Sequence, residues 1–214
     1  MIDGIIFDMD GVLVDSEPAI TRASMAALAE WGVEAEYGDF KQYTGMGDDL
    51  FIGGVARKYG REYDLRMKAR AYEIYLEKAD EWVKVYPWSK PLIDLFSKKY
   101  KLAVASASDR VKVECNLRCI GADPSVFSAL ITGSDVKNKK PAPDIFLLAA
   151  EKAGFGSKSA VVFEDAVSGV MAAKAAGCVC IAVTTSFPAG KLYQAGADFA
   201  VDDLSLAPEI IEKL

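Results

Sequence analysis

The stretch IDGIIFDMDG, residues 2–11, decides the fold expected for this chain. Its first part, residues 2–7, is a short and nearly continuous apolar run, which is typical of a strand covered on both faces. Two acidic residues, Asp8 and Asp10, follow directly, and Gly11 permits a sharp turn of the backbone. The stretch therefore predicts a buried strand that ends in a turn carrying two carboxylates.

Similar apolar runs recur along the chain. They lie at residues 102–105, 129–132, 160–163, 180–184 and, more weakly, 199–201. Helical patterns at residues 143–153 and 168–176 separate some of them, and each pattern stops at a glycine, Gly154 or Gly177, suited to end a helix. Alternating strands and helices predict an α/β fold with a doubly wound, Rossmann-like parallel sheet.

Residues 16–83 interrupt this alternation. Ser16 and Pro18 are start signals for a helix and Gly32 is a stop signal. Two further apolar stripes at helical spacing follow, and no strand pattern lies between them. We therefore expect an α/β core domain formed by residues 1–15 and 84–214, with an all-helical domain, residues 16–83, inserted after the first strand.

Composition excludes several classes of function. The 214 residues are 51% hydrophobic, carry a net charge of −6 and include no histidine. Ser-His-Asp and Cys-His catalysis are thus excluded, as are zinc sites that need imidazole. Scattered basic residues on an acidic chain argue against a nucleic acid partner.

The sequence also lacks the signals of a membrane or secreted protein. No apolar run approaches the ~20 residues of a membrane-spanning helix, and acidic residues punctuate the only apolar stretch near the N-terminus. The four cysteines have no C-x-x-C spacing, which favours free thiols in a reducing compartment. We expect a soluble monomer without a signal peptide.

Polar side chains follow the ends of the predicted strands, where an open parallel sheet binds its ligands. Crowded carboxylates repel one another unless a cation lies between them, and oxygen ligands without histidine or thiolate favour Mg2+. The strand ends therefore predict a magnesium site. The residues concerned are Asp8, Asp10, Ser106, Lys140, Glu164 and Asp165.

This set of residues suits the hydrolysis of a phosphate ester. One of the carboxylates Asp8 and Asp10 can attack phosphorus while the other handles the leaving-group proton. To donate that proton near pH 7, Asp10 would need a raised pKa, and we predict such an environment. Each residue taken alone has a structural explanation, such as capping a helix; their joint order along the chain favours the catalytic interpretation.

At this point the chain resembles the haloacid dehalogenase superfamily of phosphohydrolases. The resemblance implies that Asp8 is the nucleophile and a metal ligand, and that Asp10 is the general acid/base and binds Mg2+ through its main-chain carbonyl. It implies an inserted helical domain that acts as a mobile cap over the substrate. The segments that carry the resemblance are residues 7–12, 104–108, 140–146 and 163–165. They further imply that Ser106 and the Ala107 amide hold the phosphoryl group and that Lys140 bridges Asp8 and the phosphate. They also imply that Asp165 ligates Mg2+, with Glu164 beside it as a ligand directly or through water.

The residues DSEP at 15–18 and KPAPDIF at 140–146 resemble the β-phosphoglucomutase-like branch of the superfamily, with Glu17 expected at the substrate. Mutases of this branch usually carry a histidine where this chain has Ile20, and an arginine in the next cap loop, residues 44–48, is also missing. These departures argue against a mutase. Arg57, Lys58 and Arg61 could contact a second anionic group, although their spacing also suits a solvated face.

Residues 53–56 and 107–113 more weakly resemble the hydrolase domain of the plant suppressor-of-quenching protein. Such a domain would lie in the plastid stroma; otherwise we expect a cytoplasmic protein.

The leading hypothesis is therefore a Mg2+-dependent phosphatase that acts on a small phosphorylated metabolite, such as a sugar phosphate. A sugar-phosphate mutase is the first alternative. A catalytically silent regulatory or interaction domain is the second.

Overall fold

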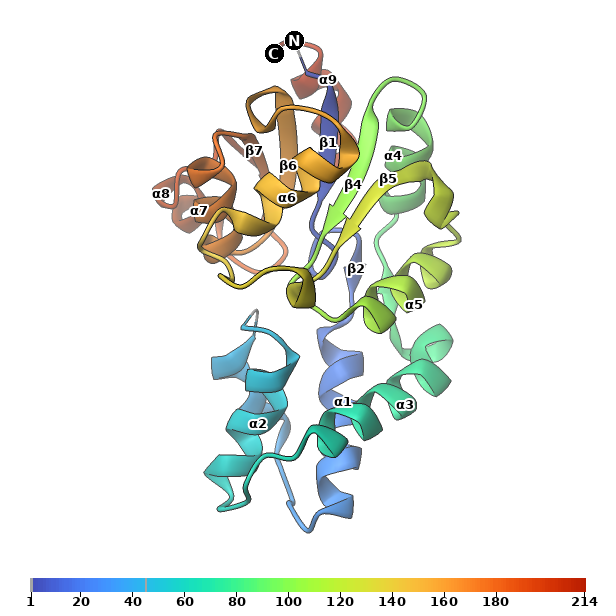
Figure 1. The fold of residues 1–214 in the computed structure, drawn as a ribbon, viewed down its shortest axis with the longest axis vertical. Helices are drawn as coiled ribbons and strands as arrows, with labels where there is room; N and C mark the ends of the chain where they lie inside the picture. Colours follow the sequence, from blue (N-terminus) through green and yellow to red (C-terminus); the bar gives the residue numbers. More distant parts are fainter. Residues whose placement is uncertain (1, 45) are drawn as a thin grey trace.

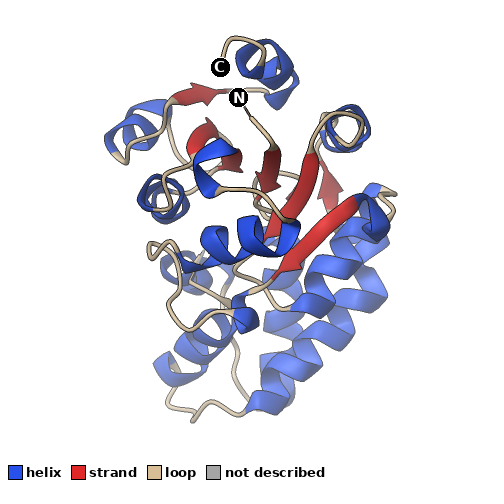
Figure 2. Cartoon of the chain, turned by 45° about the horizontal axis from the view of Figure 1, so that its top comes forward, coloured by secondary structure: helices blue, strands red, loops and turns tan. Residues whose placement is uncertain are grey.

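The computed structural model describes residues 2–44 and 46–214, and a parallel six-stranded sheet forms its centre (Figures 1 and 2). The strand order is β5-β4-β1-β6-β7-β8, so β1 lies between β4 and β6 and the chain winds outward in both directions. The doubly wound α/β class predicted from the sequence is confirmed. The strands are β1 (Gly4–Phe7), β4 (Lys101–Ala105), β5 (Phe127–Ile131), β6 (Ala160–Glu164), β7 (Val179–Val183) and β8 (Phe199–Val201).

Helices cover both faces of this sheet, which explains the continuous apolar runs. In β1, Ile5 and Phe7 point into one core while Ile6 points into the other, and all three are fully buried. Burying a large apolar side chain contributes roughly 1.5–3 kcal/mol. One face packs against α4 (Ser89–Phe96), α5 (Arg110–Ile120) and α9 (Ala207–Ile211), and the other against α6 (Asp144–Ala153), α7 (Val167–Ala175) and α8 (Ala189–Gln194).

A helical insert lies beyond the carboxyl ends of the strands, at the bottom of Figure 1. It has its own hydrophobic core, to which the fully buried Tyr75 and Ile52 belong. The Tyr75 hydroxyl donates a hydrogen bond of 2.6 Å to Asn116 Oδ1 of α5, a buried polar link between the insert and the sheet domain. The insert comprises α1 (Glu17–Glu30), a 3-10 helix (Tyr37–Tyr43), α2 (Asp48–Lys58) and α3 (Leu65–Trp82).

A short antiparallel ribbon connects the insert to the sheet. Its strands, β2 (Val14–Asp15) and β3 (Lys84–Val85), lie on the segments that enter and leave the insert. The sequence does not predict this ribbon, because two-residue strands are too short for an alternation pattern. The ribbon lies beside the boundaries predicted at 15/16 and 83/84, and the division into two domains stays a prediction.

Other expectations can be compared with the structure directly. The strands predicted at 102–105, 160–163, 180–184 and 199–201 agree with β4, β6, β7 and β8 to within a residue, whereas β5 begins two residues before position 129. The four cysteines are free. In the described part of the chain, no helix has both the length and the apolar character needed to cross a membrane.

Candidate active site

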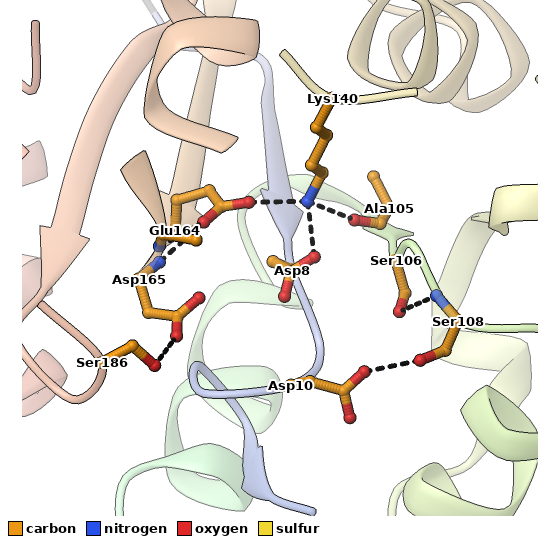
Figure 3. Close-up of polar contacts among 10 residues, drawn as sticks. Asp8, Asp10, Ala105, Ser106, Ser108, Lys140, Glu164, Asp165 and Ser186 are labelled. Atoms are coloured by element: carbon orange, nitrogen blue, oxygen red, sulfur yellow. Dashed lines mark hydrogen bonds and ion pairs between the residues drawn. The ribbon is translucent and has the colours of Figure 1, made fainter. Parts of the chain in front are cut away.

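Asp8 lies at the carboxyl end of β1, in the middle of the sheet, where the order of the strands reverses. Its backbone N–H donates to Phe163 O at 2.9 Å, which continues the pairing with β6 by one residue. The residue is 6% exposed, and its side-chain Oδ1 accepts a hydrogen bond of 2.6 Å from Lys140 Nζ (Figure 3). The strand thus delivers a buried carboxylate with one oxygen fixed by an ammonium group.

Lys140 joins the ends of three strands. Its Nζ lies 2.6 Å from Asp8 Oδ1, 2.6 Å from Glu164 Oε1 and 3.4 Å from Ala105 O. The Lys140 side chain is 7% exposed, and the two carboxylates raise its pKa although burial alone would lower it. Lys140 therefore stays charged and holds Asp8 and Glu164 together.

Glu164 is the last residue of β6, and its carboxylate accepts hydrogen bonds from other groups of the protein. Its Oε1 accepts from Lys140, and its Oε2 accepts from the backbone N–H groups of Asp165 and Ala166, both at 2.8 Å. Both carboxylate oxygens are therefore engaged within the protein. This arrangement favours a role in positioning Lys140 and the turn that carries Asp165, with any contact to a metal made through water.

Asp165 is the second buried carboxylate that faces the end of β1. The Ser186 hydroxyl donates to Asp165 Oδ2, as Figure 3 shows. Burial raises the pKa of Asp165, and the nearby charges of Glu164 and Asp8 raise it further. Burial likewise raises the pKa of Asp8, to about 7, with Glu164 and Asp10 adding to the shift against the opposing effect of Lys140. At this edge of the sheet, the carboxyl groups of Asp8, Glu164 and Asp165 thus outnumber the single ammonium group of Lys140.

Asp10 turns away from Asp8 toward α5 and the start of the helical insert. Ser16 Oγ and Ser108 Oγ donate to its two carboxylate oxygens, the latter at 2.8 Å, and Lys112 Nζ lies 3.2 Å from Oδ1. Burial tends to raise the pKa of Asp10, but Lys112 and the two hydroxyl groups outweigh it, and the pKa is lowered. The raised pKa predicted from the sequence is therefore wrong for this arrangement.

The residues of the second predicted segment lie at the end of β4. Ser106 is fully buried, and its hydroxyl oxygen accepts from the Ser108 N–H at 3.2 Å. Ala107 and Ser108 line the cavity described below. Gly133, which follows β5, packs so closely against Ala107 that an added Cβ would clash with the Ala107 carbonyl. The segment after β4 is therefore tightly packed against the segment after β5.

A cavity of about 360 Å3 lies between the sheet and the helical insert. Its volume is in the range of about 300–1,000 Å3 that is usual for small-molecule sites. The sheet side contributes Asp8, Asp10, Lys140, Glu164 and Asp165 to its walls, so these five of the six predicted strand-end residues come together. The sixth, Ser106, is fully buried and is not among the described residues that line the cavity. The insert contributes Glu17, Ile20, Tyr43, Thr44, Asp48 and Phe51.

Two of these insert residues are tied to neighbouring elements. The Glu17 carboxylate, predicted at the substrate, accepts a hydrogen bond of 3.2 Å from Thr44 Oγ1. Asp48 accepts one of 2.5 Å from the Tyr72 hydroxyl. Burial raises the pKa of Asp48, with Lys112 acting in the opposite direction.

Sequence reasoning missed several residues of this site. Lys112 is 4% exposed, and its Nζ contacts Ser108 Oγ at 3.1 Å as well as Asp10. It lies in the first turn of α5, whereas Ser108 precedes that helix, so no helical spacing in the sequence indicates this contact. Asp48 and Ser186 likewise carry no signal, because each reaches the cavity from a distant segment.

The donor set can be tested against the predicted Mg2+. No group of three or more His, Cys, Asp or Glu side chains arranged to hold a metal occurs within residues 2–44 and 46–214. The resemblance, however, implies the carboxylates of Asp8 and Asp165, the main-chain carbonyl of Asp10, and Glu164 either directly or through water. Asp8 Oδ2 and Asp165 Oδ1 accept no hydrogen bond from the described residues, and any Cβ at Gly11 would clash with the Asp165 carboxylate. Two buried carboxylates with raised pKa values and free oxygens fit a hard cation.

Comparison with known proteins places this chain in a family. The haloacid dehalogenase-like hydrolases match residues 5–183. The chain is 40% identical over 208 residues to Protein SUPPRESSOR OF QUENCHING 1, chloroplastic, from Arabidopsis thaliana; the match covers 95% of the chain and 20% of that protein. It is 33% identical over 211 residues to a phosphorylated carbohydrates phosphatase from Thermotoga maritima, with 92% of each chain covered.

Among solved structures, CbbY from Rhodobacter sphaeroides in complex with phosphate matches with a TM-score of 0.81 at 27% identity, and 96% of both chains is covered. The predicted resemblances to the superfamily, to its β-phosphoglucomutase-like branch and to the suppressor-of-quenching protein are confirmed. The chain belongs to the haloacid dehalogenase-like hydrolases.

Proposed function

We propose that the chain is a Mg2+-dependent phosphatase of small phosphorylated metabolites and that Asp8 carries the phosphoryl group during turnover. One observation carries this proposal. Asp8 lines the cavity with Oδ1 fixed by Lys140 at 2.6 Å, while Oδ2 accepts no hydrogen bond from the described residues. A carboxylate held on one side and open on the other is suited to nucleophilic attack.

In the first step Asp8 Oδ2 attacks phosphorus, and the bond from phosphorus to the leaving-group oxygen breaks. As the family resemblance implies, we assign to Lys140, the Ser106 hydroxyl and the Ala107 amide the stabilisation of the negative charge of the transferring group. When bound by Asp8, Asp165 and the Asp10 carbonyl, Mg2+ supplies further neutralisation of the charge on the phosphoryl group. Lys140 also separates Glu164 from Asp8 and so limits the repulsion between these carboxylates.

In the second step a water molecule attacks the phosphorus of phosphoryl-Asp8, which releases phosphate and regenerates the carboxylate. Asp10 accepts the proton of that water, and it can return the proton to the leaving oxygen of the next substrate. The lowered pKa of Asp10 keeps this carboxylate ionised at neutral pH, the form that can accept a proton. The helical insert, as a cap, would exclude bulk water from both steps.

The residues at the cavity argue against the mutase alternative. Ile20 lines the cavity at the position where mutases of this branch usually carry histidine, and the chain contains no histidine at all. Product analysis with a sugar 1-phosphate separates the two activities. Release of inorganic phosphate without an isomeric sugar phosphate supports a phosphatase, and faster isomer formation supports a mutase.

The function is tested by measuring hydrolysis of a panel of phosphate esters with and without Mg2+. We expect Mg2+-dependent release of phosphate that a chelator stops and Asp8→Asn abolishes. Asp3→Asn is a matched control, because Asp3 is exposed just before the opposite end of the same strand. Hydrolysis that survives Asp8→Asn, or that does not need a divalent cation, would contradict the proposal.

The match to the Arabidopsis protein supports a plastid stromal location within a longer protein, with the cytoplasm as the alternative. Imaging of a fluorescent fusion of the full-length protein distinguishes these compartments. The monomeric state stays a prediction, which light scattering of the purified chain tests.

A further inference from the structure

Lys112 is a buried lysine to which the mechanism above gives no role. It lies in the first turn of α5 and is 4% exposed. The ring of Tyr75, from α3 of the insert, lies beside it, with the ring centroid 5.9 Å from Lys112 Nζ. An ammonium group is costly to bury unless it is paired, so its partners indicate what it does.

Lys112, Asp10 and Ser108 form a closed ring of polar contacts. Lys112 Nζ lies 3.2 Å from Asp10 Oδ1 and donates a hydrogen bond of 3.1 Å to Ser108 Oγ. Because that oxygen accepts from Lys112, its own proton is directed to Asp10 Oδ2, to which it donates at 2.8 Å (Figure 3). Each member therefore orients the next, and the Asp10 carboxylate is held at both oxygens.

The next turn of α5 adds a contact from Asn116. Lys112 and Asn116 are four residues apart, so they lie on one face of the helix. Asn116 Nδ2 donates to Asp10 Oδ1 at 3.4 Å, and Asn116 Oδ1 accepts from the Tyr75 hydroxyl at 2.6 Å. This face of α5 thus connects Asp10 to the insert.

The two carboxylate oxygens of Asp10 are not equivalent. Three donors converge on Oδ1, whereas Oδ2 accepts from Ser108 alone among the described residues. The three donors to Oδ1 are Ser16, Lys112 and Asn116. A carboxylate oxygen has about two acceptor positions, so Oδ1 is fully engaged and Oδ2 keeps one position. Since Asp10 also lines the cavity, Oδ2 is the oxygen left to carry a proton there.

We propose, on the basis of the phosphatase function above, that Lys112 is a positioning residue that anchors Asp10 Oδ1 so that Oδ2 faces the leaving group. In the first step, the proton on Oδ2 passes to the leaving-group oxygen as the bond from that oxygen to phosphorus breaks, and Asp10 becomes a carboxylate. Without the anchor the carboxyl group rotates away from this position, and a displacement of about 1 Å can cost about a hundredfold in rate. Lys112 acts only through Asp10.

The test compares two esters that differ in their need for the proton. p-Nitrophenyl phosphate loses a stable phenolate, whereas p-nitrobenzyl phosphate, which is one methylene longer, loses an alkoxide that needs a proton. The quantity compared is kcat/KM, which covers the steps through formation of phosphoryl-Asp8. Each variant is measured at its own pH optimum, so that a changed pKa of Asp10 is not mistaken for a changed position.

Lys112→Met should lower kcat/KM for the benzyl ester about tenfold or more, and for the phenyl ester about threefold or less. In an Asp10→Asn background the same substitution should cause no further selective loss, because the group that Lys112 positions is gone. Equal effects on the two esters would overturn the proposal, since a purely structural ion pair predicts them. A selective loss that persists in the Asp10→Asn background would overturn it as well.

A second variant tests the ring without removing a charge. Ser108→Ala deletes the donor to Asp10 Oδ2 and should lower the ratio of benzyl to phenyl kcat/KM about threefold, even if Lys112→Met does not fold. An unchanged ratio in the folded Ser108→Ala protein would refute the ring. Lys68→Met is the matched control, because Lys68 is a partly buried lysine of the insert whose partners are Asp49 and Asp109. Its ratio should stay that of the wild type, and an equal shift in this control would refute the assignment to Lys112.

A crystal structure of the Lys112→Met protein shows the position of Asp10 without turnover. We expect the Asp10 carboxylate to leave the place that it occupies in the wild type. A displaced Asp10, together with a wild-type protein that hydrolyses neither ester, would sustain the positioning role and refute the phosphatase. An Asp10 that keeps its place, in a protein whose hydrolysis depends on Asp8, would refute the positioning role and sustain the phosphatase.

Discussion

Lys140→Met is the substitution whose effect follows most directly from the structure. Lys140 Nζ is the ammonium group bonded to both Asp8 and Glu164, at 2.6 Å from each, and the three side chains are at most 9% exposed. Methionine preserves most of the length and apolar contact of the side chain but removes the charge. The variant therefore leaves Asp8, Glu164 and Asp165 crowded and buried without their cation.

Removing one partner of a buried ion pair costs about 3–5 kcal/mol, because the remaining charge is neither solvated nor compensated. We expect Lys140→Met to lower the free energy of unfolding by this amount, measured by urea denaturation of the metal-free protein. For a chain of this size, 1 kcal/mol corresponds to about 2–4 °C in Tm. Lys90→Met is the matched control: its pair with Asp94 is exposed, so about 0.5 kcal/mol or less should be lost.

The cause is tested by adding Glu164→Gln to Lys140→Met. Because the second change removes one of the uncompensated charges, the double variant should be less destabilised than the sum of the single variants, by about 1–3 kcal/mol. A loss below about 1 kcal/mol for Lys140→Met, or strict additivity in the double variant, would refute the electrostatic account of this site.

Three further outcomes are expected. Lys112→Met should raise the pKa of Asp10, because its charge lies 3.2 Å from Oδ1, and the acidic limb of the kcat profile should move to higher pH. The pKa of Asp8 is about 7 in the folded protein, above its value in the unfolded chain. Protonation of Asp8 therefore stabilises the folded protein at low pH, and this stabilisation is lost as pH rises toward and through 7. The Tm of the metal-free protein should therefore fall from pH 5 to pH 8, Mg2+ should raise Tm more at pH 8, and Asp8→Asn should flatten both trends. Tyr75→Phe should cost about 1–3 kcal/mol in urea denaturation, because it leaves buried Asn116 without a donor.

The sequence predicts the sheet well because its strands are buried on both faces. An apolar run such as residues 160–163 has no solvated side, so its hydrophobic pattern is continuous and its end is marked by the first charged residues, Glu164 and Asp165. The same logic brings Asp8 and Lys140 to one edge of the sheet. These positions follow from topology alone.

The electrostatics of the site could not be predicted in the same way. The pKa of Asp10 depends on Lys112, Ser16 and Ser108, which approach it from α5, from the start of the insert and from the loop after β4. Asp48 reaches the cavity only because the insert folds back over the sheet. Such contacts join distant segments, and no local pattern in the sequence records them.

The central claim is that Asp8 accepts the phosphoryl group, and rapid acid quenching during turnover tests it most directly. Mass spectrometry of the digested protein should find one phosphoryl group on the peptide that contains Asp8, in wild-type protein with Mg2+ and not in Asp8→Asn. Steady hydrolysis with no phosphorylated peptide at any quench time, or with the phosphoryl group on another residue, would contradict the account.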